Sequence, residues 1–227
     1  MTRFSVNNTI TMTLIMIMSK EWKGNKKSVS TMLGISTTWH PEERAAGDYY
    51  TTDPTAVRQF INHLQIDGKI TNGIIWEPAC GCGNISKELI NAGYNVFSTD
   101  LHNRGFGESG IDFLQTFIKP LDCDTIITNP PYSLANEFIL KAMDILPDYG
   151  RYYALMNISY LTGIKRYKEI YEKGYLRGIY IYPHRIHCYK NNEITGHSSP
   201  VNYAWFEFCP ATLVNKYIRP RISWIEK

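Results

Sequence analysis

The feature that most constrains the fold of this chain is a regular alternation of strand-like and helix-like segments. Short runs rich in β-branched and aromatic residues stand at 73–77, 94–100, 124–129, 151–156, 178–183 and 201–208. Amphipathic helical patterns at 53–64, 84–93 and 133–146 alternate with them. A strand followed by a helix returns to the sheet in the same direction, so this order predicts a mostly parallel α/β sheet with helices on both faces.

The start of the chain does not continue this pattern. Residues 19–47 are polar and rich in Lys, Ser, Gly and Thr. We expect residues 1–47 to form a partly disordered arm, and residues 48–227 to form one domain without a separate target-recognition domain. The apolar run at 10–18 is much shorter than the ~20 residues that a membrane-spanning helix needs, so we expect no membrane association. The true start, Met1, Met16 or Met18, stays open.

The net charge and the cysteines of the chain bear on its partners, on metal binding and on its cellular compartment. The formal net charge of the 227-residue chain is +3, which permits a nucleic-acid partner without requiring one. The five cysteines form no Cys-x-x-Cys pair and no Cys/His cluster with zinc-ligand spacing. We therefore expect reduced thiols in a cytoplasmic protein, and no metal site.

A glycine loop between two acidic strand ends carries the clearest binding signal. Glu77 ends the first predicted strand, Gly81 and Gly83 allow a tight turn, and Asp100 ends the next strand. Ligands of open α/β sheets bind beyond the carboxyl ends of the strands. The loop lacks the third glycine of a dinucleotide fingerprint and the Gly-Lys-Ser/Thr of a P-loop. Glu77 would repel phosphate but attract an ammonium, and Asp100 suits ribose hydroxyls, so the pattern favours S-adenosylmethionine.

These motifs resemble those of class I S-adenosylmethionine-dependent methyltransferases. "EPACGCG" (77–83) is similar to motif I, "NPPY" (129–132) to motif IV of the amino-methyltransferases, "DYYTTDP" (48–54) to the motif ahead of motif I, and "GIDFL" (110–114) to the strand-three segment. The tail at 182–208 is similar to the last strands of phage and mobile-element DNA adenine methyltransferases. The resemblance implies a Rossmann-like seven-stranded sheet, mostly parallel, with one antiparallel strand near the C-terminus.

The resemblance also implies which residues hold the cofactor. The Tyr-Thr-Thr segment would hold the methionine end, Asp112 would meet the adenine amine, and Phe113 would pack on the adenine ring. The expected cofactor-binding residues are Tyr50, Thr51, Thr52, Glu77, Pro78, Ala79, Cys80, Gly81, Gly83, Asp100, Leu101, Asp112 and Phe113.

The "NPPY" segment has the composition of a site for a planar amine. The side-chain oxygen of Asn129 and the carbonyl of Pro130 can accept hydrogen bonds from the amine and localise its nitrogen lone pair. Pro130 and Pro131 stiffen the loop, so the acceptors are held in place before substrate binds. Tyr132 offers a flat face for stacking a base. The alternative is structural, because Asn-Pro after a strand is a common turn signal and a nearby aromatic is often in the core.

A basic and tyrosine-rich stretch at 165–190 suggests the substrate. Basic residues interleaved with aromatics favour nucleic acid, although a solvated surface is the alternative. We expect contacts to substrate from Lys165, Arg166, Arg185 and Tyr189. A base inside a duplex would have to be flipped out of the stack to reach the "NPPY" loop.

The predicted function is methyl transfer from S-adenosylmethionine to the exocyclic amine (N6) of a flipped-out adenine in DNA. An RNA adenine or guanine amine methyltransferase is one alternative. A non-catalytic nucleic-acid-binding protein with a relict cofactor pocket is another. Without a recognition domain, a short hairpin near 184–200 would read a small site, recognition would be loose, or a protein partner would supply it. The sequence determines neither the recognition sequence, nor the oligomeric state, nor a phage or host role.

Overall fold

The computed structural model describes residues 50–70, 73–117, 119–186, 188–190, 201–211 and 218–226 of the chain. By its internal contacts the chain divides into two units, Met1–His40 and Pro41–Lys227, and every described residue belongs to the second. The arm predicted at 1–47 lies outside the described residues, so the domain limits stay a prediction.

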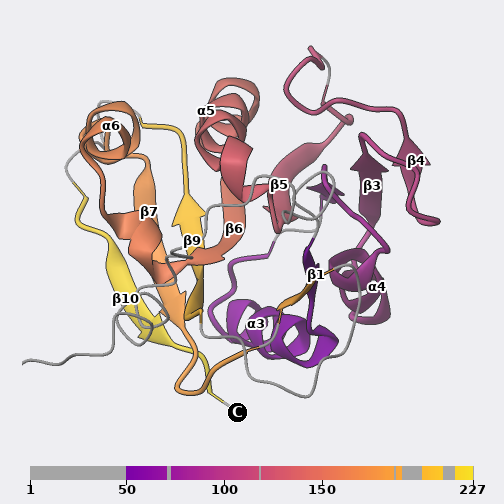
Figure 1. Ribbon diagram of the computed structural model, residues 1–227, viewed down its shortest axis with the longest axis horizontal. Coiled ribbons are helices and arrows are strands. Elements are labelled where there is room, and N and C mark those ends of the chain that lie inside the picture. Colours follow the sequence, from indigo (N-terminus) through magenta and orange to yellow (C-terminus); the bar gives the residue numbers. More distant parts are fainter. Residues whose placement is uncertain are drawn as a thin grey trace, which may run out of the picture. The chain divides into compact units, whose positions relative to one another are not determined.

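Strands and helices alternate along the described part of the chain (Figure 1). In chain order the elements are β1 (Tyr50–Thr52), α3 (Pro54–Ile66), β2 (Ile74–Glu77), α4 (Asn84–Asn91), β3 (Val96–Asp100), β4 (Glu108–Ser109), β5 (Cys123–Thr128), the 3-10 turn η2 (Tyr132–Leu134), α5 (Ala135–Ile145), β6 (Arg151–Asn157), the 3-10 turn η3 (Ile158–Leu161), α6 (Ile164–Arg166), the π-helical turn η4 (Tyr167–Tyr171), β7 (Leu176–Ile181), β8 (Cys188–Lys190), β9 (Tyr203–Phe208) and β10 (Arg221–Trp224).

Within the described residues, eight strands form one sheet in the order β10-β7-β9-β6-β5-β2-β3-β4. Neighbouring strands run parallel except around β9, which is antiparallel to both β6 and β7. The predicted mostly parallel sheet with one antiparallel strand near the C-terminus is confirmed. The eighth strand is β10, which pairs with β7 beyond the last strand that the sequence indicated.

The predicted strands agree with the observed ones to within a few residues, except at 110–114. There the strand is only Glu108–Ser109, and a turn follows it. The side chain of Asp112 accepts a hydrogen bond from the backbone N–H of Leu114 at 2.9 Å. An aspartate that binds the backbone two residues ahead stabilises a turn, so this segment follows the strand rather than forming it.

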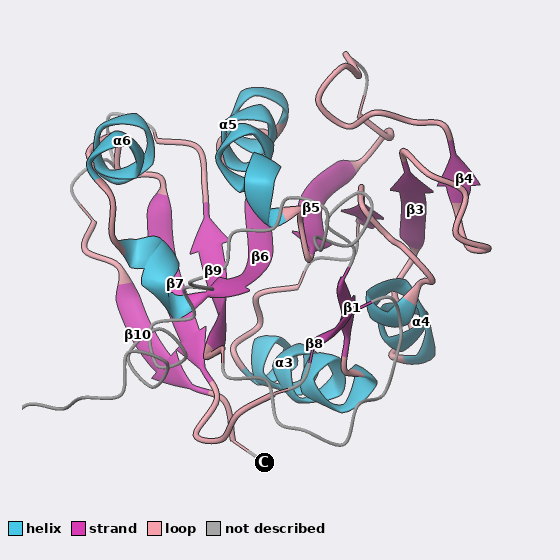
Figure 2. Ribbon diagram, viewed as in Figure 1, coloured by secondary structure: helices cyan, strands magenta, loops and turns pink. Residues whose placement is uncertain are grey.

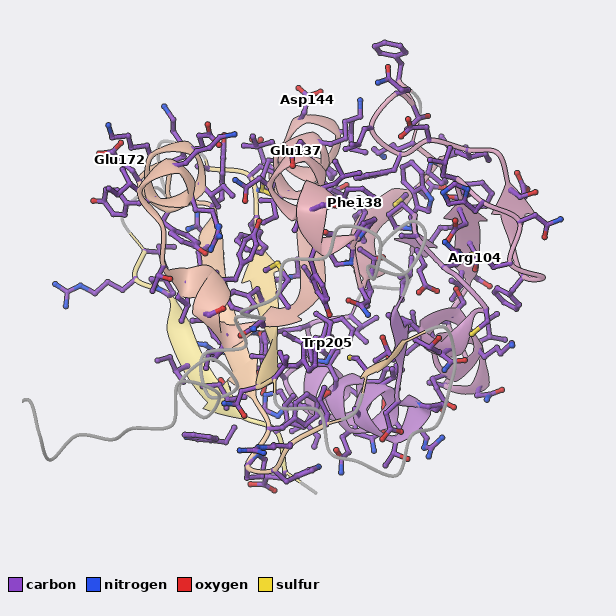
Figure 3. All side chains as sticks on the ribbon, viewed as in Figure 1. Arg104, Glu137, Phe138, Asp144, Glu172 and Trp205 are labelled. Atoms are coloured by element: carbon purple, nitrogen blue, oxygen red, sulfur yellow. The ribbon has the colours of Figure 1, made fainter. Side chains whose placement is uncertain are left out.

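Helices cover both faces of the sheet, as predicted (Figure 2). Alternate residues of β6 and β9 go to opposite faces because side chains alternate along a strand. The face that packs against α5 and η4 carries Tyr152, Ala154, Met156, Ala204 and Phe206. The face that packs against α3 and α4 carries Tyr153, Leu155, Tyr203 and Trp205. Trp205 projects toward α3, where its ring stacks on Phe60 with centroids 4.3 Å apart (Figure 3).

The helices begin and end where local signals indicate. The carboxylate of Asp53 accepts a hydrogen bond from Thr55 N–H at 2.8 Å and so caps α3. The α4 helix ends just before Gly93, whose φ of 91° suits a residue without a side chain. Among the described helices, none combines the length and the apolar character that crossing a bilayer requires.

Candidate active site

The carboxyl ends of three neighbouring parallel strands meet at one edge of the sheet. There β2 ends at Glu77, β3 ends at Asp100, and Asn129 directly follows β5. This is the edge where ligands bind in open α/β sheets. The topology therefore brings the glycine loop, the second acid and the "NPPY" loop together.

Glu77 is a buried acid that forms no ion pair with any residue that the structure describes. Its side chain is 1% exposed, and it accepts hydrogen bonds from Ser86 N–H, at 2.8 Å, and from the Ser86 hydroxyl. None of the ion pairs between described residues includes Glu77. Burial raises the pKa of Glu77 to about 8; the Ser86 bonds oppose this and the charge of Asp100 adds to it. A cationic ligand would relieve this cost.

The glycine loop is tied to Asp100. Gly81, with a φ of 56°, donates its N–H to one Asp100 oxygen at 2.9 Å, and His102 N–H donates to the other at 2.8 Å. Each carboxylate oxygen can accept more than one hydrogen bond, so Asp100 retains capacity for hydroxyl donors. Gly83 serves packing, because a Cβ there would lie 2.4 Å from the Phe106 ring.

The other predicted residues follow the ends of β2 and β3. Pro78 and Cys80 are buried, Ala79 is half-buried and Leu101 is exposed. The Cys80 thiol contacts the carbonyl of Phe106 at 3.4 Å. Burial, together with the charge of Glu77, raises the pKa of Cys80 to about 12, so the thiol stays neutral. All five cysteines are free thiols, and the described residues contain no cluster of His, Cys, Asp or Glu that could hold a metal.

The short β1 strand joins the glycine loop to the "NPPY" loop. It pairs antiparallel with β8, and its residues Thr51 and Thr52 are buried. The carbonyl of Thr52 accepts a hydrogen bond from the Asn84 side chain at 2.8 Å, at the start of α4. The Thr52 hydroxyl accepts one from the Asn129 side-chain nitrogen at 3.2 Å. Thr52 therefore contacts both halves of the site. The Tyr50 side chain lies outside the described part.

The "NPPY" loop holds its amide and its aromatic ring in place. Since Thr52 binds the nitrogen of the Asn129 amide, the amide oxygen faces away from Thr52. Pro130 is buried, and Pro131 accepts a hydrogen bond from Leu134 N–H at 2.9 Å, which closes the turn. The half-buried Tyr132 ring stacks on Tyr203, with centroids 6.2 Å apart and planes at 23°.

Three residues of the site had not been identified from the sequence. Ser86 binds Glu77, Tyr203 backs Tyr132, and Cys188 lies close enough to the hydroxyls of both tyrosines for them to influence its pKa. Burial raises the pKa of Cys188 to about 12, although these hydroxyls lower it. For Ser86, the sequence signal was a serine on the predicted buried face of a helix. The contacts of Tyr203 and Cys188 depend on strand pairing.

Phe113 packs in the hydrophobic core. It is buried, with ring centroids 5.1 Å from Trp76 and 4.9 Å from Phe138. Asp112 is half-buried in the turn after β4. Their roles toward an adenine stay predictions.

Some basic residues at 165–190 are exposed, whereas Arg166 is hydrogen-bonded within the chain. Lys165 is exposed and lies 3.9 Å from Glu169. Arg166 instead donates to the carbonyls of Tyr160 and Thr162, and its guanidinium stacks 4.0 Å from the Tyr160 ring. Arg185 is exposed. The Tyr189 side chain and residues 187 and 191–200 of the predicted hairpin lie outside the described residues.

No family model matches the sequence, and no curated protein matches it significantly. Solved structures do share the fold. A Listeria monocytogenes protein assigned to the class I S-adenosylmethionine-dependent methyltransferases has a TM-score of 0.54 at 14% identity, over 88% of this chain and 71% of that one. The methyltransferase subunit of a type I restriction-modification system from Streptococcus thermophilus has a TM-score of 0.53 at 14% identity, over 73% of this chain and 45% of the subunit.

A third structure comes from Pyrococcus horikoshii and is assigned as an RNA methyltransferase. Its TM-score is 0.55 at 15% identity, over 80% of this chain and 95% of that one. At such identities the likeness shows the fold alone. The described unit therefore has the class I methyltransferase fold, and the three proteins are assigned to different substrates or to none.

Proposed function

We propose that this protein transfers a methyl group from S-adenosylmethionine to the exocyclic amine N6 of adenine in DNA. The proposal rests on Thr52, which contacts both the helix after the glycine loop and Asn129. These contacts link the loop proposed to bind the cofactor with the loop proposed to bind the amine. The class I methyltransferase fold supports the cofactor.

The residues of the glycine loop fit that cofactor. The buried Glu77, which lacks a cation among the described residues, would pair with the amino group of the methionine moiety. Asp100 would accept from the ribose hydroxyls, and Tyr50, Thr51 and Thr52 would border the methionine end. Pro78, Ala79, Cys80, Gly81, Gly83, Leu101, Asp112 and Phe113 complete the proposed set. When bound, S-adenosylmethionine supplies an electrophilic methyl group on a positively charged sulfur.

The "NPPY" loop would prepare the amine. The Asn129 side-chain oxygen and the Pro130 carbonyl accept hydrogen bonds from the two amine hydrogens, which localises the nitrogen lone pair. Tyr132, backed by Tyr203, stacks on the base and holds the amine in line with the methyl group. S-adenosylmethionine held by Glu77 and Asp100 would supply the methyl group to this nitrogen and leave as the neutral thioether, and the amine would give one proton to water.

DNA is proposed over RNA because the C-terminal tail resembles that of DNA adenine methyltransferases. Lys165 and Arg185 are exposed and are proposed phosphate contacts. A protein partner that supplies target recognition is part of the same proposal. A cytoplasmic location belongs to the same proposal.

The decisive experiment incubates the full chain with methyl-labelled cofactor and unmethylated genomic DNA, or with total RNA, and then separates the nucleosides. We expect label in N6-methyldeoxyadenosine, and loss of that label in Asn129→Ala. Label confined to RNA nucleosides would support the RNA alternative. Cofactor affinity without transfer to either polymer would support the non-catalytic alternative.

A further inference from the structure

An unusual cluster of exposed apolar side chains follows the carboxyl end of β6. Ile164 is 80% exposed and Tyr167 is 56% exposed. Since residues three apart on a helical turn are neighbours, these two side chains lie side by side. Lys165 and Lys168, also three apart and both exposed, flank them. The surface is therefore apolar at its centre and basic beside it.

The first residues of this segment, 158–160, contact residues close to Tyr132. At its start, Ile158 N–H donates to the carbonyl of Asn202 at 2.9 Å, and the next residue, Tyr203, stacks on Tyr132. In its middle, the Tyr160 hydroxyl donates to the side chain of Asn136, four residues beyond Tyr132. Two contacts thus link the start of this segment to the surroundings of the proposed base platform.

The segment is also held rigidly, which makes the exposure of its apolar tip a fixed feature. Arg166 donates to the carbonyl of Tyr160 at 2.7 Å, and the Tyr171 hydroxyl donates to the same carbonyl at 2.6 Å. The side chain of Asn157 caps the first turn by accepting from Ser159 N–H at 2.9 Å. Arg166 thus braces the segment, and its predicted contact with substrate stays a prediction.

We propose that Ile164 and Tyr167 form an apolar wedge that enters the base stack of duplex DNA where the target adenine is flipped out. Lys165 and Lys168 contact the phosphates beside the gap. Flipping a base loses its stacking and pairing, and apolar side chains inserted between base steps compensate for the lost stacking. The inference rests on the proposed function, and it assigns to this face a duplex rather than a protein partner because of the flanking lysines.

The test compares duplex DNA with the same target strand alone, in single-turnover methylation. A single strand has no stacked partner to replace, so the wedge matters only for the duplex. We expect Ile164→Ala combined with Tyr167→Ala to lower the duplex rate or affinity roughly tenfold to a hundredfold, with single-strand methylation nearly unchanged. Ile164→Leu should restore most of the duplex activity in the presence of Tyr167. Calorimetric cofactor affinity reports that the variants are folded.

Ile66→Ala is the matched control, because Ile66 is 85% exposed at the end of α3, and it should change neither substrate. A second readout is the fluorescence of 2-aminopurine at the target position, whose rise on binding should shrink in the double variant. Equal losses on duplex and single strand, or no loss on either, would overturn the wedge while leaving the methyltransferase proposal intact. A wild-type protein inactive on both substrates would overturn both.

Discussion

Two glutamates are buried at opposite edges of the same sheet, and their surroundings differ. Glu77, at the carboxyl end of β2, accepts hydrogen bonds from Ser86 and forms no ion pair within the described part of the chain. Glu207 is 3% exposed and pairs with Arg151 and, at 3.1 Å, with Lys69. Because Arg151 begins β6, this ion network lies at the edge away from the proposed active site.

The difference separates a structural charge from one suited to a ligand. Glu207 is compensated by cations of its own chain, so its charge belongs to the folded protein. It also receives a hydrogen bond from the Tyr180 hydroxyl. No cation among the described residues compensates Glu77. Its raised pKa reflects the free-energy cost of burying the ionised carboxylate. Substitutions at the two positions should therefore affect different properties.

The largest effect expected is on stability, from Glu207→Ala. Removing one partner of a buried ion pair leaves the other charges uncompensated and costs ~3–5 kcal/mol. Because Arg151 and Lys69 retain some solvent exposure, we expect the lower end of that range. Denaturant unfolding measures it, and cofactor affinity below the unfolding midpoint should be unchanged. A loss below ~1 kcal/mol would mean that the network behaves like a surface ion pair.

Next in size is the rate effect of Asn129→Ala at the other edge. One of two preorganised acceptors is lost, so single-turnover methylation should fall ~100- to 1,000-fold while DNA and cofactor affinity change little. Stability should change far less than in Glu207→Ala. Near-normal turnover would show that the loop is only a turn.

Glu77→Gln should reduce cofactor affinity without destabilising the protein. A hydrogen bond to a charged group contributes ~1.5–3 kcal/mol, so affinity should fall roughly tenfold to a hundredfold. Asp100→Ala should weaken binding by a similar factor. Glu207→Gln is the matched control in calorimetry, because it removes the same charge from the opposite edge. Equal losses from both substitutions would remove the distinction between the two glutamates.

The pH dependence of stability tests the same contrast more finely. The pKa of Glu77 rises from an ordinary value of 4.5 to about 8 on folding, so the folded state holds its proton where the unfolded state does not. Stability contributed by this group is present below about pH 4.5 and is lost as pH rises to about 8. Glu77→Gln should gain stability relative to wild type over that window.

Cofactor binding should reverse that protonation. A cationic ligand favours the ionised acid, so binding near pH 7 should release a proton to the buffer, in contrast to Glu77→Gln. Calorimetry in two buffers with different ionisation enthalpies detects the release. Identical heats in both buffers would argue against pairing of Glu77 with the ammonium.

The smallest effect expected is from Tyr132→Phe. The ring face supports the base and is kept in this variant, so turnover should stay within a few-fold of wild type. Tyr132→Ala should weaken capture of the base by ~1–3 kcal/mol. A large loss in the Phe variant would assign a direct role to the hydroxyl.

The sequence by itself determined the elements whose signals are local. The alternating runs predicted the parallel order, Asp53 predicted the start of α3, and Glu77, Asp100 and "NPPY" were recognised at the ends of their strands. Such signals depend on neighbours within a few residues, on side-chain periodicity and on turn chemistry. The order of the predicted elements then indicated the fold class, because only a few topologies connect parallel strands through helices.

Only the tertiary structure decided which residues meet. Thr52 reaches Asn129 across 77 positions, and Lys69 reaches Glu207 across 138. Arg166 braces the turn after β6, a contact that the basic stretch did not predict. Such contacts depend on strand register, and shifting a strand by one residue turns every side chain to the opposite face. Because Glu207 lies in an otherwise apolar run, the sequence did not identify the cations that compensate it; only the packing of β6, β7 and β9 against the end of α3 did so.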